Sequence, residues 1–374
     1  MDWSQAKEIL CIRLDSLGDV LMTGPAIRAL KSQVRGRRIT LLTSRSGAEA
    51  AKLMPEIDRV LVYDAPWLKA TRPRESAEPE FGWIEKLKGY EFDGAVIFTV
   101  YSQNPLPSAM LCYLAEIPLR LAYCRENPYQ LLTHWVKETE PQDQIRHEVK
   151  RQLDLVVTVS PGSSPGVFDD RMAVQVSEES GDRVLKNLIE LGIDVMAPWA
   201  VMHPGATAPS RRYPPKKFAE AARTLIEEHG YEIVLTGSKD ETSLVEELLK
   251  ELPNHRQRVH SLVGLLSLED LAALLTLAPV LISNNTGTVH LAAACETPVV
   301  DLYALTNPQH TPWKVRNRVL FQDVECRYCY KSVCPEGHNA CLTGVASAEV
   351  VRATLELQNE RISDVHAWNQ CRLP

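Results

Sequence analysis

The sequence predicts an α/β protein of two domains, each built on a parallel sheet. At 374 residues the chain exceeds the size at which a single hydrophobic core usually stops growing. Short, continuously apolar runs alternate with amphipathic stretches, as happens when parallel strands are buried between two layers of helices. The alternation occurs once before and once after Ser160–Gly166, a linker-like segment rich in proline, glycine and serine.

Each series supplies strands and helices in turn. In the first series we expect strands at Ile9–Leu14, Arg38–Thr43, Arg59–Tyr63 and Gly94–Thr99, helices at Asp19–Gln33 and Trp83–Lys88, and a surface loop at Ala65–Glu80. In the second we expect strands at Trp199–His203, Glu232–Thr236, Val280–Ser283 and Pro298–Tyr303, with helices at Glu178–Leu191, Pro215–His229, Thr242–Glu251, Leu268–Leu277, Thr288–Ala294 and Ser347–Ile362. Two Rossmann-like domains follow, at residues 1–175 and 176–345, with a C-terminal helix at 346–374 whose packing the pattern does not indicate.

Charge and composition exclude several classes of protein. The net charge of −7 and the pI near 5.9 disfavour a nucleic-acid-binding protein. The polar start Met1–Glu8 does not resemble a secretory signal, and no apolar run approaches the roughly 20 residues that span a bilayer. The nine cysteines are scattered through a long chain rather than spaced as a disulfide framework. We therefore expect a cytoplasmic protein, either free or in peripheral contact with the cytoplasmic face of the inner membrane.

Three segments join a predicted strand to a helix, the position at which open α/β sheets bind ligands. The first is Asp15-Ser16-Leu17-Gly18-Asp19, where the glycine permits close backbone approach and Asp19 stands at the mouth of the sheet. The alternative interpretation is that Asp15, Ser16 or Asp19 only caps the helix. The segment lacks G-x-G-x-x-G spacing and so does not indicate a dinucleotide site.

The second segment, His203–Pro215, has the composition of an anion site. Its small residues leave backbone N–H groups accessible, and Arg211 and Arg212 add positive charge where a diphosphate would bind. A surface loop with solvated arginines is the alternative.

The third segment, Ser283–His290, has the composition of a phosphate cradle. It places hydroxyls and backbone amides at a predicted helix N-terminus, from Thr286, Gly287 and Thr288. Taken alone, His290 is more typical of a buried core residue.

Taken together, four strings of the sequence resemble glycosyltransferase family 9, the ADP-heptose:lipopolysaccharide heptosyltransferases. They are "ILCIRLDSLGDVLMTGPAIRALK", "HPGATAPSRRYPPKKFAEAARTL", "LTGSKDE" and "LISNNTGTVHLAAACETPVVDLYALTNP", and the likeness covers nearly the whole chain. The resemblance implies a GT-B fold, with two facing Rossmann-like domains, an interdomain cleft, the acceptor bound mainly by the N-terminal domain and the nucleotide sugar by the C-terminal domain. It also implies inverting, metal-independent transfer of a heptose or related sugar from ADP-heptose to a hydroxyl of a glycan or lipid-linked acceptor, as in lipopolysaccharide core synthesis.

The resemblance also implies roles for individual residues. Asp19 matches the catalytic aspartate that deprotonates the acceptor hydroxyl, on an acceptor-side loop that includes Asp15, Ser16 and Gly18. The donor-binding residues are Thr207, Ser210, Arg211, Glu241, Asn285, Thr286, Gly287, Thr288 and His290. Among these, Arg211 is matched to the diphosphate and Glu241 to the ribose. No Asp-x-Asp motif occurs in a suitable loop, in agreement with transfer that needs no metal cofactor.

The chain departs from the family pattern at two positions. Asn285 stands where the heptosyltransferases normally have aspartate, which leaves the identity of the donor sugar open. Asp15 stands where a small polar residue is common, so a second carboxylate is expected near Asp19.

Four cysteines fall within sixteen residues. The spacing Cys326-x2-Cys329-x4-Cys334-x6-Cys341 offers four soft ligands to one structural zinc or iron ion, and His338 is a substitute for one of them. A loop of reduced thiols is the alternative.

Two other functions remain open at the level of sequence. One is a nucleotide-sugar epimerase with a GT-B-like fold, which the "SLGDV" loop fits poorly. The other is a non-catalytic protein that binds sugar nucleotides, which Asp19 argues against and Asn285 leaves open.

Overall fold

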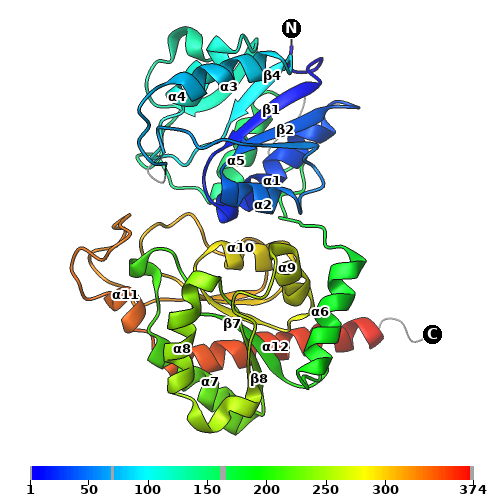
Figure 1. Cartoon of the computed structure of the whole chain (residues 1–374), viewed down its shortest axis with the longest axis vertical. Coiled ribbons are helices and arrows are strands. Elements are labelled where there is room, and N and C mark those ends of the chain that lie inside the picture. Colours follow the sequence, from blue (N-terminus) through cyan, green and yellow to red (C-terminus); the bar gives the residue numbers. More distant parts are fainter. Residues whose placement is uncertain (1, 69–70, 161–165, 371–374) are drawn as a thin grey trace. The chain divides into compact units, whose positions relative to one another are not determined.

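The apolar runs of the first series form one parallel sheet of six strands. The computed structural model describes residues 2–68, 71–160 and 166–370, so Pro161–Pro165 of the predicted linker lie outside the described residues. The strands are β1 (Glu8–Arg13), β2 (Arg38–Thr43), β3 (Arg59–Val62), β4 (Gly94–Ile97), β5 (Leu119–Cys124) and β6 (His134–Lys137). The helices are α1 (Leu17–Ser32), α2 (Arg45–Ala51), α3 (Glu78–Lys88), α4 (Leu106–Leu114) and α5 (Glu148–Val157), with the short η1 (Tyr129–Leu131) (Figure 1).

The second series forms another parallel sheet of six strands. They are β7 (Trp199–His203), β8 (Glu232–Leu235), β9 (Val259–Ser261), β10 (Leu281–Asn284), β11 (Val299–Leu302) and β12 (Asn317–Leu320). The helices are α6 (Glu178–Glu190), α7 (Pro215–His229), α8 (Thr242–Lys250), α9 (Leu268–Leu277), α10 (Gly287–Ala294), α11 (Ala340–Thr343) and α12 (Ser347–Gln370), with η2 (Pro209–Arg211), η3 (Lys239–Glu241) and η4 (Pro253–Arg258).

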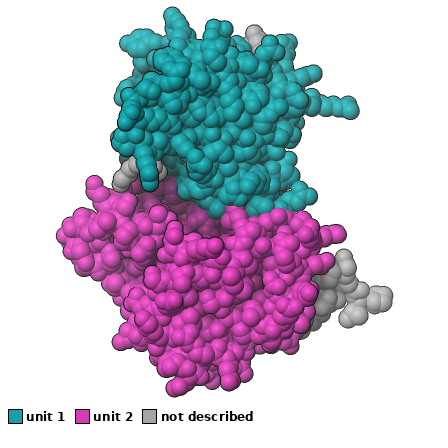
Figure 2. Space-filling view, in the orientation of Figure 1, with its two compact units in different colours: residues 1–175 teal, residues 176–374 magenta. Residues whose placement is uncertain are grey.

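The chain divides into two compact units, Met1–Gln175 and Val176–Pro374, which Figure 2 colours separately. Helix α12 packs on α7, β11 and β12, so within the second unit it belongs to the same core as the sheet. Among the residues that the structure describes, none of the helices combines the length and apolar character needed to cross a bilayer.

Both sheets have the doubly wound strand order. The first runs β3-β2-β1-β4-β5-β6 and the second β12-β11-β10-β7-β8-β9. In each, the first strand of the unit lies beside the fourth, and the chain leaves these two neighbours in opposite directions. The crevice at their carboxyl ends is the position where such sheets bind ligands. These switch points lie between β1 and β4 in one unit and between β7 and β10 in the other.

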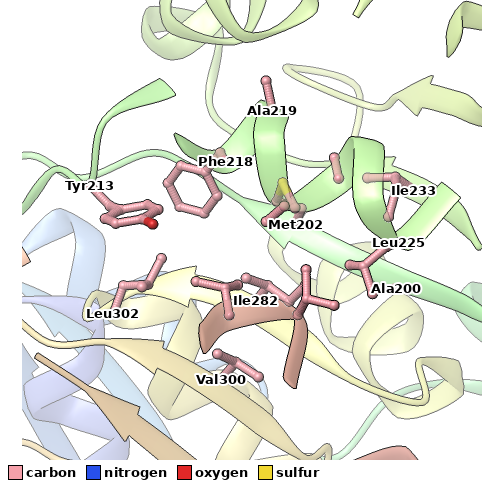
Figure 3. Packing of buried hydrophobic residues seen from close by; sticks show 14 of the residues in the cluster. Ala200, Met202, Tyr213, Phe218, Ala219, Leu225, Ile233, Ile282, Val300 and Leu302 are labelled. Atoms are coloured by element: carbon pink, nitrogen blue, oxygen red, sulfur yellow. The ribbon is translucent and has the colours of Figure 1, made fainter. Parts of the chain in front are cut away.

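The second unit's core shows why its strands are apolar throughout. Met202, Ile282 and Val300 come from adjacent strands and pack under α7 and α12 (Figure 3). Beside them the Tyr213 and Phe218 rings meet edge to face, with centroids 5.1 Å apart. Burying such side chains is worth about 1.5–3 kcal/mol each, which fixes the register of the strands that carry the candidate site.

The predicted boundaries shift by a few residues. Helix α1 begins at Leu17 rather than Asp19, and α3 begins at Glu78, within the segment predicted to be a loop. Pro79 in the first turn of α3 and acidic residues beside it stabilise a helix N-terminus there. The final helix extends to Gln370 instead of ending at Ile362.

Candidate active site

A buried arginine organises the carboxyl end of β1. Arg13 is fully buried, and its guanidinium forms ion pairs with Asp15 (Nε–Oδ2 3.0 Å), Asp19 (Nη2–Oδ1 3.2 Å) and Glu148 (Nη1–Oε1 2.9 Å). A buried charge is tolerated only when it is paired, and three carboxylates around one cation leave the cluster net acidic. Sequence analysis missed the roles of Arg13 and Glu148. The available signal was an arginine inside an otherwise apolar strand.

Asp19 is both a helix cap and a member of this cluster. Its Oδ2 accepts hydrogen bonds from the Ser16 backbone N–H (3.1 Å) and from the Ser16 hydroxyl (2.6 Å). Asp19 therefore caps helix α1, and capping is not its only contact because it also pairs with Arg13. The carboxylate nevertheless keeps 15% of its side chain exposed while both oxygens are held in place. Gly18 lies buried beside it.

Asp15 places a second carboxylate on the same guanidinium, as the sequence predicts. Its Oδ1 accepts a hydrogen bond of 2.5 Å from Gln103 Nε2. Burial raises the pKa of Asp15 to about 6; Arg13 opposes this rise and the charge of Asp19 adds to it. Asp15 also lines a pocket of about 380 Å³, together with Trp67, Phe98 and Gln103.

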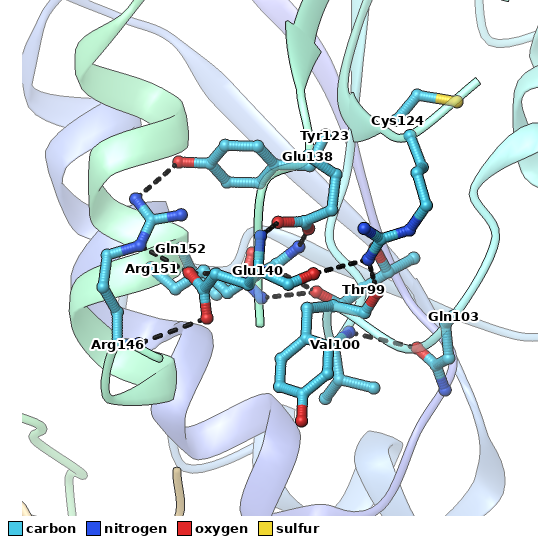
Figure 4. Close-up of polar contacts among 12 residues, drawn as sticks. Thr99, Val100, Gln103, Tyr123, Cys124, Glu138, Glu140, Arg146, Arg151 and Gln152 are labelled. Atoms are coloured by element: carbon cyan, nitrogen blue, oxygen red, sulfur yellow. Dashed lines mark hydrogen bonds and ion pairs between the residues drawn. The ribbon is translucent and has the colours of Figure 1, made fainter. Parts of the chain in front are cut away.

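Helix α5 forms hydrogen bonds to the segment after β4, which carries Gln103. Gln152 donates to the Thr99 carbonyl (2.9 Å), and the buried Arg151 donates to the same carbonyl while pairing with Glu138 (Figure 4). Gln103 itself accepts from the Val100 N–H (3.2 Å). The Asp15–Gln103 bond thus spans the switch point between β1 and β4 and is fixed from the β4 side.

In the second unit, Asn284 spans the corresponding switch point. At the end of β10, its Nδ2 donates to the Pro204 carbonyl (2.7 Å) and its Oδ1 accepts from the Tyr213 N–H (2.9 Å). One buried amide therefore fastens both ends of the Pro204–Tyr213 loop, which follows β7. The second and third sequence motifs are brought together as predicted, although sequence analysis did not single out Asn284.

Glu241 lies directly against the start of this loop. A Cβ on Gly205 would overlap the Glu241 carboxyl, so any larger residue there requires the Glu241 side chain to move. The carboxylate accepts from the Ser238 N–H (2.8 Å) and hydroxyl (3.1 Å). Burial lowers the pKa of the neighbouring His203, and the charge of Glu241 opposes that fall.

The start of α10 leaves a hydroxyl available. Thr286 is the N-cap residue, and its buried Oγ1 has no hydrogen-bond partner among the described residues. Gly287 begins the helix, and Thr288 and His290 are buried within its first turns. The His290 ring meets the His310 ring edge to face, with centroids 6.2 Å apart. Backbone N–H groups and a free hydroxyl at a helix N-terminus suit an oxyanion.

The remaining predicted donor residues differ in what they contact. Arg211, in η2, lies near the buried Tyr303 at the end of β11. Thr207 is exposed on the same loop. Ser210, by contrast, is buried and bonded to the cysteine-rich segment: its hydroxyl donates to the Lys331 carbonyl (2.7 Å) and its N–H to the Ser332 carbonyl (3.1 Å).

The four clustered cysteines come near one another. Burial raises the pKa of the Cys341 thiol, and the nearby Cys326, Cys329 and Cys334 raise it further. Cys334 Sγ accepts a hydrogen bond from the Asn339 N–H (3.4 Å). Across the part of the chain that the structure describes, no three His, Cys, Asp or Glu side chains are arranged to hold a metal ion.

Comparison with known proteins decides the family. The model of "Glycosyltransferase family 9 (heptosyltransferase)" matches residues 82–340, well over half of the chain. The chain belongs to glycosyltransferase family 9. A curated relative, lipopolysaccharide heptosyltransferase 1 of Pseudomonas aeruginosa, is 26% identical over 330 residues, covering 87% of each chain.

Solved structures show that this transferase has the GT-B fold. A family 9 glycosyltransferase from Veillonella parvula superimposes with a TM-score of 0.76 at 18% identity, over 96% of this chain and 98% of the other. ADP-heptose lipopolysaccharide heptosyltransferase II of E. coli gives 0.72 at 23% identity, over 95% and 99%.

Gly205→Ala should destabilise the transferase by about 1 kcal/mol, because the new Cβ displaces the Glu241 carboxyl from its capping bonds to Ser238. Gly82→Ala is the matched control: its Cβ meets nothing within 4 Å in helix α3, so we expect no loss and a gain of up to about 1 kcal/mol. Urea denaturation measures both, and equal stability of the two variants would contradict the contact.

The raised pKa of Asp15 makes stability depend on pH. Between its ordinary pKa near 4 and the folded value of about 6, the native state holds more protons than the unfolded chain, so stability falls as pH rises. Asp15→Asn removes this titration and keeps an acceptor for Gln103. Its unfolding free energy relative to wild type should therefore increase from about pH 4 to about pH 6 and then level off.

Urea titrations at several pH values test this expectation. The control Asn104→Ala alters the same pocket without changing a titrating group, so its difference from wild type should stay flat. A flat difference for Asp15→Asn as well would show that Asp15 titrates normally.

Proposed function

We propose that this transferase moves a heptose, or a closely related sugar, from ADP-heptose to a hydroxyl of a lipopolysaccharide-type acceptor. The named relatives that transfer heptose support the donor and the acceptor. One observation carries the proposal: the two switch points present different groups. In the first unit three carboxylates surround one buried arginine, whereas the second presents Arg211 and the N–H groups of α10, with the Glu241 carboxylate beside Gly205.

On the donor side, the diphosphate binds at the start of α10 and at Arg211. The unpartnered Thr286 hydroxyl and the first N–H groups of α10 supply hydrogen bonds, and the guanidinium supplies charge. Glu241, fixed by Ser238, holds the ribose hydroxyls. Ser210 supports this site by holding the neighbouring segment in place rather than by touching the donor.

On the acceptor side, Asp19 acts as the general base. It takes the proton of the acceptor hydroxyl as that oxygen bonds to the anomeric carbon of the donor. The bond from that carbon to the phosphate oxygen breaks in the same step, so the configuration inverts and ADP leaves. The pocket beside Asp15, with Trp67 and Phe98, suits one face of a sugar ring.

The charge on the departing ADP is balanced by the protein's own groups. Arg211 and the α10 N-terminus are fixed before the reaction, and preorganised donors of this kind stabilise a developing anion without rearrangement. We therefore propose that the transfer needs no metal ion.

An epimerase would act on the nucleotide sugar alone, whereas a transferase releases ADP only when an acceptor is present. Monitoring ADP release with and without an acceptor separates these reactions, and a binding protein would release none in either case. Acceptor-independent turnover would overturn the proposal.

Asp19→Ala should reduce kcat by at least about 10²–10⁴-fold, because it removes the base, and leave ADP affinity within a few-fold. It also removes a helix cap, which costs about 1 kcal/mol. The chain offers a matched control in Asp270, which caps α9 through Ser267 and pairs with Arg183. Asp270→Ala should lose similar stability and keep its kcat.

For both variants, steady-state kinetics gives kcat, calorimetry gives the affinity for ADP and urea denaturation gives the free energy of unfolding. If Asp270→Ala lost as much activity as Asp19→Ala, the effect at position 19 would be one of folding. If Asp19→Ala lost ADP binding and kept turnover, Asp19 would not be the base.

We also propose that Cys326, Cys329, Cys334 and Cys341, which are not arranged for coordination in this structure, close around one structural zinc or iron ion. Four thiolates are the ligand set that these metals prefer, and a backbone N–H bonded to a ligating sulfur is typical of such sites. The ion would stiffen the segment to which Ser210 is bonded, next to Arg211.

Elemental analysis of chain purified without chelator should find about one zinc or iron ion per chain, and the double variant Cys329→Ser/Cys334→Ser should lose it. Cys295→Ser, outside the cluster, is the control and should retain the metal. Equal metal content in the double variant and the wild type would overturn this assignment.

A further inference from the structure

Asn285, which stands where the family pattern has aspartate, is bonded to a buried carboxyl group. Its Nδ2 donates to Asp301 Oδ2 (3.0 Å) and to the His310 carbonyl (2.9 Å). Asp301 lies on β11, fully buried, and its other oxygen has no hydrogen-bond partner within the described ranges. A carboxyl group buried in the middle of a sheet is costly, so its one hydrogen-bonded partner matters.

The two bonds require an amide at position 285. The Asn285 NH₂ group has two N–H donors, one for the Asp301 carboxyl group and one for the His310 carbonyl, whereas an ionised aspartate has none. An aspartate there, as the family pattern has it, would face the His310 carbonyl with a second acceptor and would place two carboxyl groups about 3 Å apart. Asn285 therefore fits Asp301, and an aspartate at position 285 would not.

The pair lies where it can control the donor loop. Asn285 connects β10 to Thr286, the N-cap residue of α10, so the orientation of its side chain is coupled to the turn that exposes the Thr286 hydroxyl. On the other side, Asp301 is two residues from Tyr303, whose pKa burial raises and the charge of Asp301 raises further. Arg211 lies near the same tyrosine.

We propose that Asp301 is a positioning residue for the donor site, acting through Asn285. In this chain the acidic group is Asp301 on β11, whereas the family pattern has an aspartate at position 285. Asp301 fixes the Asn285 side chain by a hydrogen bond, and Asn285 in turn fixes the turn before α10. This inference rests on the proposed binding of ADP-heptose to the second unit and names what sets the geometry of that site.

The test is an exchange of the two groups. Asn285→Asp should raise the Kd for ADP about tenfold or more, because both hydrogen bonds are lost and two carboxyl groups meet. The double variant Asn285→Asp/Asp301→Asn restores one amide and one carboxyl group across the same contact. Its Kd should return to within about threefold of wild type, although the carboxyl group now faces His310. Asp301→Asn alone is the control for the second substitution. Its Kd for ADP should lie between that of the double variant and that of Asn285→Asp.

Calorimetry with ADP and thermal unfolding of the four proteins give independent readouts. If the Kd of the double variant is raised by the product of the two single-variant increases, the two residues act independently and the proposal is overturned. If Asn285→Asp lowers the Tm and leaves ADP affinity unchanged, the pair only supports the fold, which also overturns it. If the wild type fails to bind ADP at all, the proposed function fails first, and that result is distinct from both.

Discussion

Strand order is the constraint on which the rest of this structure depends. In both sheets the chain starts in the middle, winds to one edge and returns to wind to the other, so two adjacent strands send their following segments apart. The hydrogen bonds of the sheet do not join the two segments that follow these strands, so side chains connect them. Asp15 and Gln103 bridge it in the first unit, and Asn284 and Pro204 bridge it in the second. The polar residues at these positions are therefore structural, and they fix the loops on which we propose that the reaction takes place.

The two bridges differ in charge, and the chemistry follows from that difference. In the first unit the bridge includes Arg13, whose burial is tolerated only because carboxylates surround it. An excess of carboxylates near a pocket favours taking a proton from a hydroxyl. In the second unit the bridging side chain is a neutral amide, and the adjoining α10 N–H groups and Arg211 favour an anion. An anionic leaving group is suited to that surface and a hydroxyl nucleophile to the other.

The sequence predicted the long amphipathic helices and most of the apolar strands, and missed elements whose apolar runs are short or interrupted by polar residues, such as β5 with Arg120. Strands β1, β2, β7 and β8 were predicted within two residues because burial on both faces leaves their runs almost continuously apolar. No element was predicted between β4 and α6, where β6 is exposed at alternate residues and α5 has the polar side chains that hold Thr99.

The candidate site was predicted where residues follow one another in the chain and missed where they meet only in space. The Asp15–Asp19 loop and the Ser283–His290 loop are contiguous, so composition indicated them. Glu148 reaches Arg13 from helix α5, the last helix of the first unit, and Asp301 reaches Asn285 from the next strand. Long-range pairs of this kind depend on the register of the sheet, which local patterns do not contain.

Capping by Asp19 is compatible with the role in catalysis that we propose for it, and a second capping aspartate, Asp270, shows how the two sites differ. Asp270 has the same arrangement: a serine three residues earlier, two hydrogen bonds from it and an arginine pair. The difference lies in the arginine, because Arg183 is 44% exposed whereas Arg13 is fully buried. Around Arg183 water screens the charges, so the cap remains only a cap. Around Arg13 the charges interact at lower dielectric, so Asp15, Asp19 and Glu148 repel one another more strongly. The capping bonds to Ser16 hold the Asp19 carboxylate in a fixed position despite this repulsion. A general base that is in place before its substrate binds requires such a fixed position.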